Sequence, residues 1–87
     1  MSGSINSIIL DGVVSTVRRA GSWVELVLAN VGKAKTEYFT VLTKENVERE
    51  QVGQKVRVIG SLGVQRGMWR GQAESRAVVL GECLLWG

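Results

Sequence analysis

The sequence predicts an all-β fold, a small closed barrel of five strands with one short helix between the third and fourth strands. Three observations predict it. β-branched residues dominate the apolar runs, which favours strands. Within these runs, apolar side chains alternate with polar ones, as in half-buried strands. Eleven glycines and no proline separate the runs. A chain of 87 residues has room for one domain, expected to span residues 1–87.

The first two strands are expected over residues 5–16 and 23–30, with a turn at residues 18–22 between them. Gly12 lies inside the first strand, where a glycine indicates a bend or a bulge. One face of the second strand is wholly apolar and should face the core. That face consists of Val24, Leu26 and Leu28.

A hairpin loop at residues 31–35 leads to a third strand over residues 36–43. Its two faces carry Phe39 with Val41 and Tyr38 with Thr40, and alternation alone leaves open which pair points inward. Residues 44–51 are the only helix-like stretch. Val47 is its apolar anchor, and Gly53 is suited to end it in a left-handed conformation.

The fourth strand is expected over residues 55–62 and the last over residues 72–86, with a bend expected at Gly81. Between them lies a glycine-rich segment, residues 63–71. Three strands, a short helix and two further strands are the element order of the OB-fold barrel.

Composition argues against an enzyme. The chain has no histidine, which removes the commonest general base and metal ligand. Its eight acidic residues form no metal-binding or catalytic cluster. The single cysteine, Cys83, can form no internal disulfide and no zinc site alone, and its apolar surroundings predict a buried, inert thiol. We therefore expect no catalytic residue, no metal and no cofactor.

The apolar runs are too short to cross a bilayer, and the first residues lack the basic and apolar regions of a signal peptide. These features predict a cytoplasmic protein without membrane contact. The formal net charge is +3. Residues 55–87 hold five basic and two acidic side chains, whereas residues 44–54 hold two basic and three acidic ones. This uneven distribution is expected if one face of the protein meets phosphates.

Four strings in series carry a family resemblance. Two of them are residues 36–42, T-E-Y-F-T-V-L, and residues 52–62, V-G-Q-K-V-R-V-I-G-S-L. They are similar to the third-strand signature and to the segment after the helix in the family of bacterial single-stranded DNA-binding proteins. Residues 6–14 resemble its opening strand and residues 73–85 its last strand. The resemblance implies a homodimer or homotetramer, joined through sheet edges, that wraps single-stranded DNA during replication, recombination or repair.

The chain also departs from that family. Residues 31–35 lack the aromatic expected at the tip of the second hairpin, and a further aromatic after the third strand is replaced near Lys44. The acidic tail that recruits repair partners does not follow Trp86. These departures point to a minimal form, from a phage or plasmid, or to a primosomal single-strand binder that also contacts replication proteins.

Single-strand binding needs flat side chains for bases and cations for phosphates. Trp69 stands between Arg66 and Arg70 with no acid nearby, which makes this stretch the strongest candidate. Tyr38 takes the place of a base-stacking tryptophan of the family. Trp23 either stacks on a base or packs on the barrel mouth.

The remaining candidate cations lie on strands and turns. They are Lys55 and Arg57 on the fourth strand, Lys33 and Lys35 on the second hairpin, and Arg18 with Arg19 before Trp23. Each is either a phosphate contact or a solvated charge that protects a sheet edge. Trp86 lies in the apolar C-terminal run, which indicates a role in the core or at a subunit interface.

Two other functions stay open. Small OB barrels also bind proteins through exposed edges, as a primosomal module would. RNA-binding barrels use similar stacking, and nothing in the sequence separates RNA from DNA.

Overall fold

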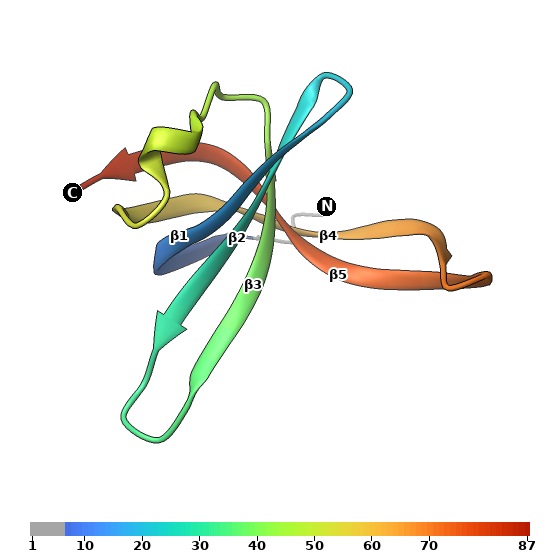
Figure 1. The fold of residues 1–87 in the computed structure, drawn as a ribbon, viewed down its shortest axis with the longest axis horizontal. Helices are drawn as coiled ribbons and strands as arrows, with labels where there is room; N and C mark the ends of the chain where they lie inside the picture. Colours follow the sequence, from blue (N-terminus) through green and yellow to red (C-terminus); the bar gives the residue numbers. More distant parts are fainter. Residues whose placement is uncertain (1–6) are drawn as a thin grey trace, which may run out of the picture.

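The computed structural model describes residues 7–87, apart from the side chain of Trp69. It contains five strands and one 3-10 turn (Figure 1). They are β1 (Ile8–Ala20), β2 (Trp23–Val31), β3 (Thr36–Thr43), η1 (Arg49–Gln51), β4 (Lys55–Trp69) and β5 (Gln72–Trp86). The beginning of the expected first strand, residues 5 and 6, lies outside the described residues. No helix in the described part of the chain is long and apolar enough to span a membrane.

The strands close into a barrel in the order β1-β2-β3-β5-β4, in which β4 returns to pair with β1. β3 and β5 run parallel, and the other four neighbouring pairs are antiparallel. The hairpins β1–β2, β2–β3 and β4–β5 extend outward from this closed part in different directions (Figure 1). The element order and the position of η1 between β3 and β4 confirm the predicted OB-fold.

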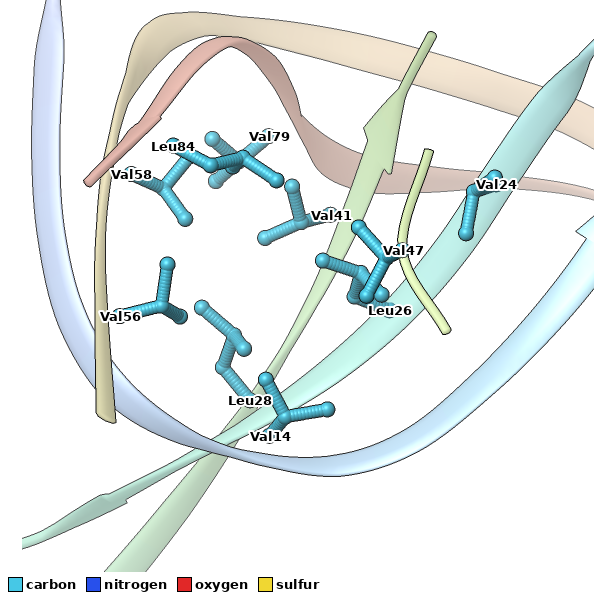
Figure 2. Close-up of a cluster of buried hydrophobic side chains, with 10 residues drawn as sticks. All are labelled: Val14, Val24, Leu26, Leu28, Val41, Val47, Val56, Val58, Val79 and Leu84. Atoms are coloured by element: carbon cyan, nitrogen blue, oxygen red, sulfur yellow. The ribbon is translucent and has the colours of Figure 1, made fainter. Parts of the chain in front are cut away.

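Alternation along the strands builds the core. Leu26 and Leu28 of β2 are fully buried, as the sequence predicts, and Val41 faces them from β3. Phe39 shares this inner face, so Tyr38 and Thr40 point outward. Figure 2 shows side chains from the strands and from the segment before η1 converging on one interior. These residues are Val14, Val24, Leu26, Leu28, Val41, Val47, Val56, Val58, Val79 and Leu84.

Two irregularities in the ladders bend the strands around the core. In β1 the register shifts between Val14 and Thr16, which places the bulge at Ser15. The sequence suggested a bend or bulge at Gly12, three residues earlier. In β5 the register shifts beside Gly81, because Ile59 pairs with Cys83 and Gly60 with Gly81. The extra residue reverses the alternation after Gly81. Cys83 is therefore exposed, and the prediction of a buried thiol is wrong.

The short helix expected between the third and fourth strands is present as the 3-10 turn Arg49–Gln51, which is shorter than the helix-like stretch 44–51. Side chains fix the preceding residues in a different conformation. The Thr43 hydroxyl accepts a hydrogen bond from the Glu45 amide at 3.1 Å, and the Glu45 carboxylate accepts one from the Leu84 amide at 3.0 Å. Val47 is nevertheless buried, as predicted. Gly53 has a φ of 92°, which confirms its left-handed conformation.

Two predicted loops are shorter in the structure. β1 continues to Ala20, so Arg18 and Arg19 lie on the strand rather than in a turn. β4 continues through the glycine-rich segment to Trp69, and only Arg70 and Gly71 remain between β4 and β5. Both have positive φ, 53° and 77°, as a two-residue type I′ hairpin turn requires.

Candidate nucleic-acid interface

The outer face of the β2–β3 hairpin presents one aromatic ring. Tyr38 lies opposite Ala29 in the ladder, and its side chain is 65% exposed. The small Ala29 side chain leaves the ring accessible, while the strand pairing fixes its position. Beyond it, the hairpin ends in a turn where the Gly32 amide donates to the Lys35 carbonyl at 2.9 Å. Lys33 and Lys35 are both exposed there.

Trp23 is the first residue of β2 and is half-buried. The ammonium of Lys44 lies 5.0 Å from the centroid of its indole ring. At a partly exposed site, such a cation–π contact is worth about 0.5–1 kcal/mol. A base that stacked on the same side of the ring would have to displace Lys44. Trp23 is therefore less available than Tyr38.

Part of the β4–β5 hairpin, residues 55–86, projects from the barrel as an arm beyond Gly60, the last residue of β4 that pairs with β1 (Figure 1). Arg66 is exposed on β4, and Arg70 is exposed in the turn at the tip. Trp69 ends β4 opposite Gln72, but its side chain is outside the described part of the structure. Stacking on Trp69 thus stays a prediction.

Arg57 forms an ion pair with an acidic residue on the adjacent strand. Its Nε lies 2.8 Å from Asp11 Oδ1 and its Nη2 3.1 Å from Oδ2, a bidentate pair. The hydrogen bond to Arg57 lowers the pKa of the Asp11 carboxyl, and the same bond raises the pKa of the guanidinium. A phosphate at Arg57 has to compete with this carboxylate. Lys55, which precedes it on the same face, is exposed.

The two arginines of β1 are also engaged. Arg18 lies directly across from Glu25 and forms an ion pair with it at 3.2 Å. The Arg19 guanidinium donates to Asn46 Oδ1 at 2.6 Å. The candidate cations therefore fall into two groups. Arg18, Arg19 and Arg57 each have a side-chain partner. Among the described residues no side-chain partner is found for the second group, which comprises Lys33, Lys35, Lys55, Arg66 and Arg70.

A groove of about 560 Å³ brings several predicted residues together. Lys55, Arg57 and Trp86 line it, with apolar side chains that include Val31 and Leu85. Trp86 also packs against the core, as the sequence indicates. Tyr38, Trp23 and Arg66 do not line this groove. The candidates are thus spread over the barrel and two hairpins rather than gathered at one pocket.

Three residues of the site are missed by the sequence reasoning. Lys44 covers Trp23, and Asp11 and Glu25 neutralise arginines. Asp11 and Arg57 are 46 residues apart, so only the β1–β4 register reveals their pairing. Glu25 and Arg18 flank the first turn, and a hairpin register centred on Gly21 and Ser22 could have predicted their contact. Among the described residues, no three His, Cys, Asp or Glu side chains group to hold a metal ion.

Solved structures with the same fold include those of three proteins. The Plasmodium falciparum SSB in complex with ssDNA superposes with a TM-score of 0.70 at 16% identity, over 99% of this chain and 97% of that one. The mitochondrial single-stranded DNA-binding protein Rim1 of S. cerevisiae gives 0.66 at 10% identity, over 97% and 96%.

The small single-stranded DNA-binding protein of Streptomyces coelicolor gives a TM-score of 0.62 at 21% identity, over 93% of both chains. No protein-family model matches this chain, and no curated protein sequence does. The three similarities extend over 93% to 99% of this chain. At these identities, what the chain shares with the three proteins is the fold.

Proposed function

We propose that this protein binds single-stranded DNA with little sequence preference, in DNA replication, recombination or repair. One observation carries the proposal. Tyr38, held on a paired strand and 65% exposed, stands next to a hairpin tip with two lysines that have no described carboxylate partner. A flat ring beside free cations is the combination that single strands need. The three similar structures are of an SSB in complex with ssDNA and of two single-stranded DNA-binding proteins, which supports the same proposal.

The aromatic side chains hold bases in this proposal. Pairing with β2 fixes the backbone of Tyr38, so the ring loses little freedom when a base stacks on it. Stacking contributes about 1–3 kcal/mol per base by alanine substitution. Every base has a π face, so such contacts tolerate any sequence. Trp69 is the second platform, and Trp23 is a third once Lys44 moves from its ring.

The cations hold the backbone. Lys33, Lys35, Lys55, Arg66 and Arg70 meet phosphates and release counterions, so affinity falls with salt. Arg18, Arg19 and Arg57 contribute less, because each already has a partner. This is a binding role that requires no metal or cofactor, and we place it in the cytoplasm.

We further propose that the chain acts as a homodimer or homotetramer. Residues Ile8–Gly12 of β1 pair with β4 on one side, and β2 joins β1 only from Val13 onward. Among the described residues this leaves one edge of Ile8–Leu10 without a strand partner, while the Asp11 carbonyl accepts a hydrogen bond from Asn30 Nδ2 at 2.7 Å. An open edge can pair with a second chain. Ile9, 66% exposed, offers apolar surface beside it.

A titration tests the proposal. A fluorescently labelled oligo-dT is titrated with protein at two salt concentrations, with matched duplex and matched oligo-U as competitors. We expect binding that salt weakens and that duplex does not displace. Tyr38→Ala should lower affinity by about 1–3 kcal/mol, while Tyr38→Phe, which keeps the ring, should bind as the parent does. Absence of binding at low salt would refute the proposal.

The same titration distinguishes the proposed function from two alternatives. Displacement by oligo-U that equals displacement by oligo-dT would assign the barrel to RNA as much as to DNA. Weak, salt-insensitive binding would favour a protein-interaction module, as in a primosomal complex, in which the open edge of β1 pairs with a replication protein. Light scattering on the free protein measures the assembly state.

A further inference from the structure

The arm formed by β4 and β5 has two different faces. Alternation places Val64, Arg66 and Met68 of β4 on one face, and the ladder sets them opposite Ala77, Ser75 and Ala73 of β5. Val64 is 62% exposed and Met68 67% exposed. A shallow groove of about 440 Å³ runs along this face, lined among others by Arg66, Met68 and Ala73.

The opposite face is already engaged near the barrel. Val78 is buried on it, and Gln65 and Arg76 line a small hollow with Thr40 of β3. The Arg76 guanidinium is paired with Glu74 at 3.3 Å. Polar groups on this side thus satisfy one another or turn toward the outer surface of the barrel. Among the described side chains of the arm, the exposed apolar surface lies on the Val64 and Met68 side.

We propose that single-stranded nucleic acid crosses the arm on the face of Val64, Arg66 and Met68. Two bases lie against the Val64 and Met68 side chains, and the phosphate between them meets Arg66. This inference rests on the proposed function and names the path of the strand. It adds Val64 and Met68 to the binding residues, with apolar contact to the base face rather than aromatic stacking.

The charge on this face favours a nucleic acid over a second copy of the chain. Arg66 stands between two apolar side chains, and its own face carries no acidic residue from β4 or β5. Glu74 borders the groove, but its carboxylate is paired with Arg76. A symmetric contact between two copies of this face would bring Arg66 toward its own counterpart without an anion to compensate. A nucleic acid supplies both an apolar base and the missing negative charge.

The test compares the two faces of the arm in the full chain. Met68→Ala and Val64→Ser should each weaken oligo-dT binding about fivefold to tenfold through lost apolar contact, with an unchanged salt slope. Arg66→Gln should reduce the slope of log K against log salt by about 0.7. Gln65→Ala, on the opposite face, is the matched control and should bind within about twofold of the parent, as surface changes outside the contact do.

The outcomes separate this inference from the proposed function. If Tyr38→Ala weakens binding but Met68→Ala and Val64→Ser do not, the strand takes another path and the inference is wrong while the function stands. If Gln65→Ala matches Met68→Ala, the preference for one face is wrong. If no variant matters because the parent does not bind, the proposed function itself fails. A shift in molecular mass with Val64→Ser, without a change in DNA affinity, would assign the face to a second copy.

Discussion

Raising the salt concentration should weaken binding with a slope set by the candidate cations that have no described side-chain partner. Each phosphate contact to a single strand contributes about 0.7 to the slope of log K against log salt. The structure separates the cations by their partners. Arg18 is paired with Glu25 at 3.2 Å and Arg57 with Asp11 at 2.8 Å. Displacing these carboxylates offsets much of what a phosphate contact would contribute.

The structure therefore predicts a particular slope. Five of the eight candidate cations have no described side-chain partner, and contacts from all five give a slope of about −3.5. If Arg18 and Arg57 contributed fully, the slope would be about −4.9. Fluorescence anisotropy of a labelled oligo-dT, measured over a series of salt concentrations, distinguishes the two values.

Two variants test the reasoning directly. Lys33→Gln removes an unpaired cation and should lower the magnitude of the slope by about 0.7. The double variant Asp11→Asn with Arg57→Gln removes one charge of each sign from an existing ion pair and should leave the slope unchanged. A double variant that lowers the slope as much as Lys33→Gln would refute the division into paired and unpaired cations. So would a parent slope near zero.

Three further predictions concern stability. Gly60→Ala should lower the free energy of unfolding by about 3 kcal/mol or more, because a Cβ there would overlap the Leu80 carbonyl oxygen. Urea denaturation measures this, and an unchanged midpoint would contradict the close approach of the two strands. Leu28→Ala empties a fully buried position and should cost about 2–5 kcal/mol, and a smaller loss would mean that the barrel collapses into the space. The lowered pKa of Asp11 means that its ion pair with Arg57 stabilises the fold above the unfolded-state pKa of about 3.8. That contribution is lost as pH falls through the folded-state pKa of Asp11. The Asp11→Asn variant should therefore be less stable than the parent near pH 7 and equally stable below that pKa. A difference in stability that persists in acid would point to another cause.

Much of the barrel is predictable because its strands are half-buried and their period is visible. Val24, Leu26 and Leu28 identify the core face of β2 without any knowledge of their neighbours. The left-handed Gly53 follows from local backbone preference in the same way. Strand identity and core face are therefore properties that short stretches of this chain determine.

Other features depend on residues distant in the sequence. The segment after β3 looks helical, but its conformation depends on the Glu45 carboxylate bonding to an amide 39 residues away. The exposure of Cys83 follows from the bulge beside Gly81, whose position only the β4–β5 register defines. Among the site residues, Arg57 looks like a free cation until β1 brings Asp11 beside it. Local patterns thus identified the residue types of the site but not their partners.

The two strand pairs that close the barrel, β1 with β4 and β3 with β5, affect how the chain folds. The β1–β2 and β2–β3 hairpins join neighbours in sequence and can form within microseconds. Closure needs β4 to reach β1, 46 residues apart at Asp11 and Arg57, and β5 to join β3 in parallel at Val41 and Val79. Such non-local pairing belongs to the millisecond-to-second range. Until it forms, the outer edges of β1 and β3 are open to other chains, so the residues that finally seal the barrel are also those most exposed to aggregation while it folds.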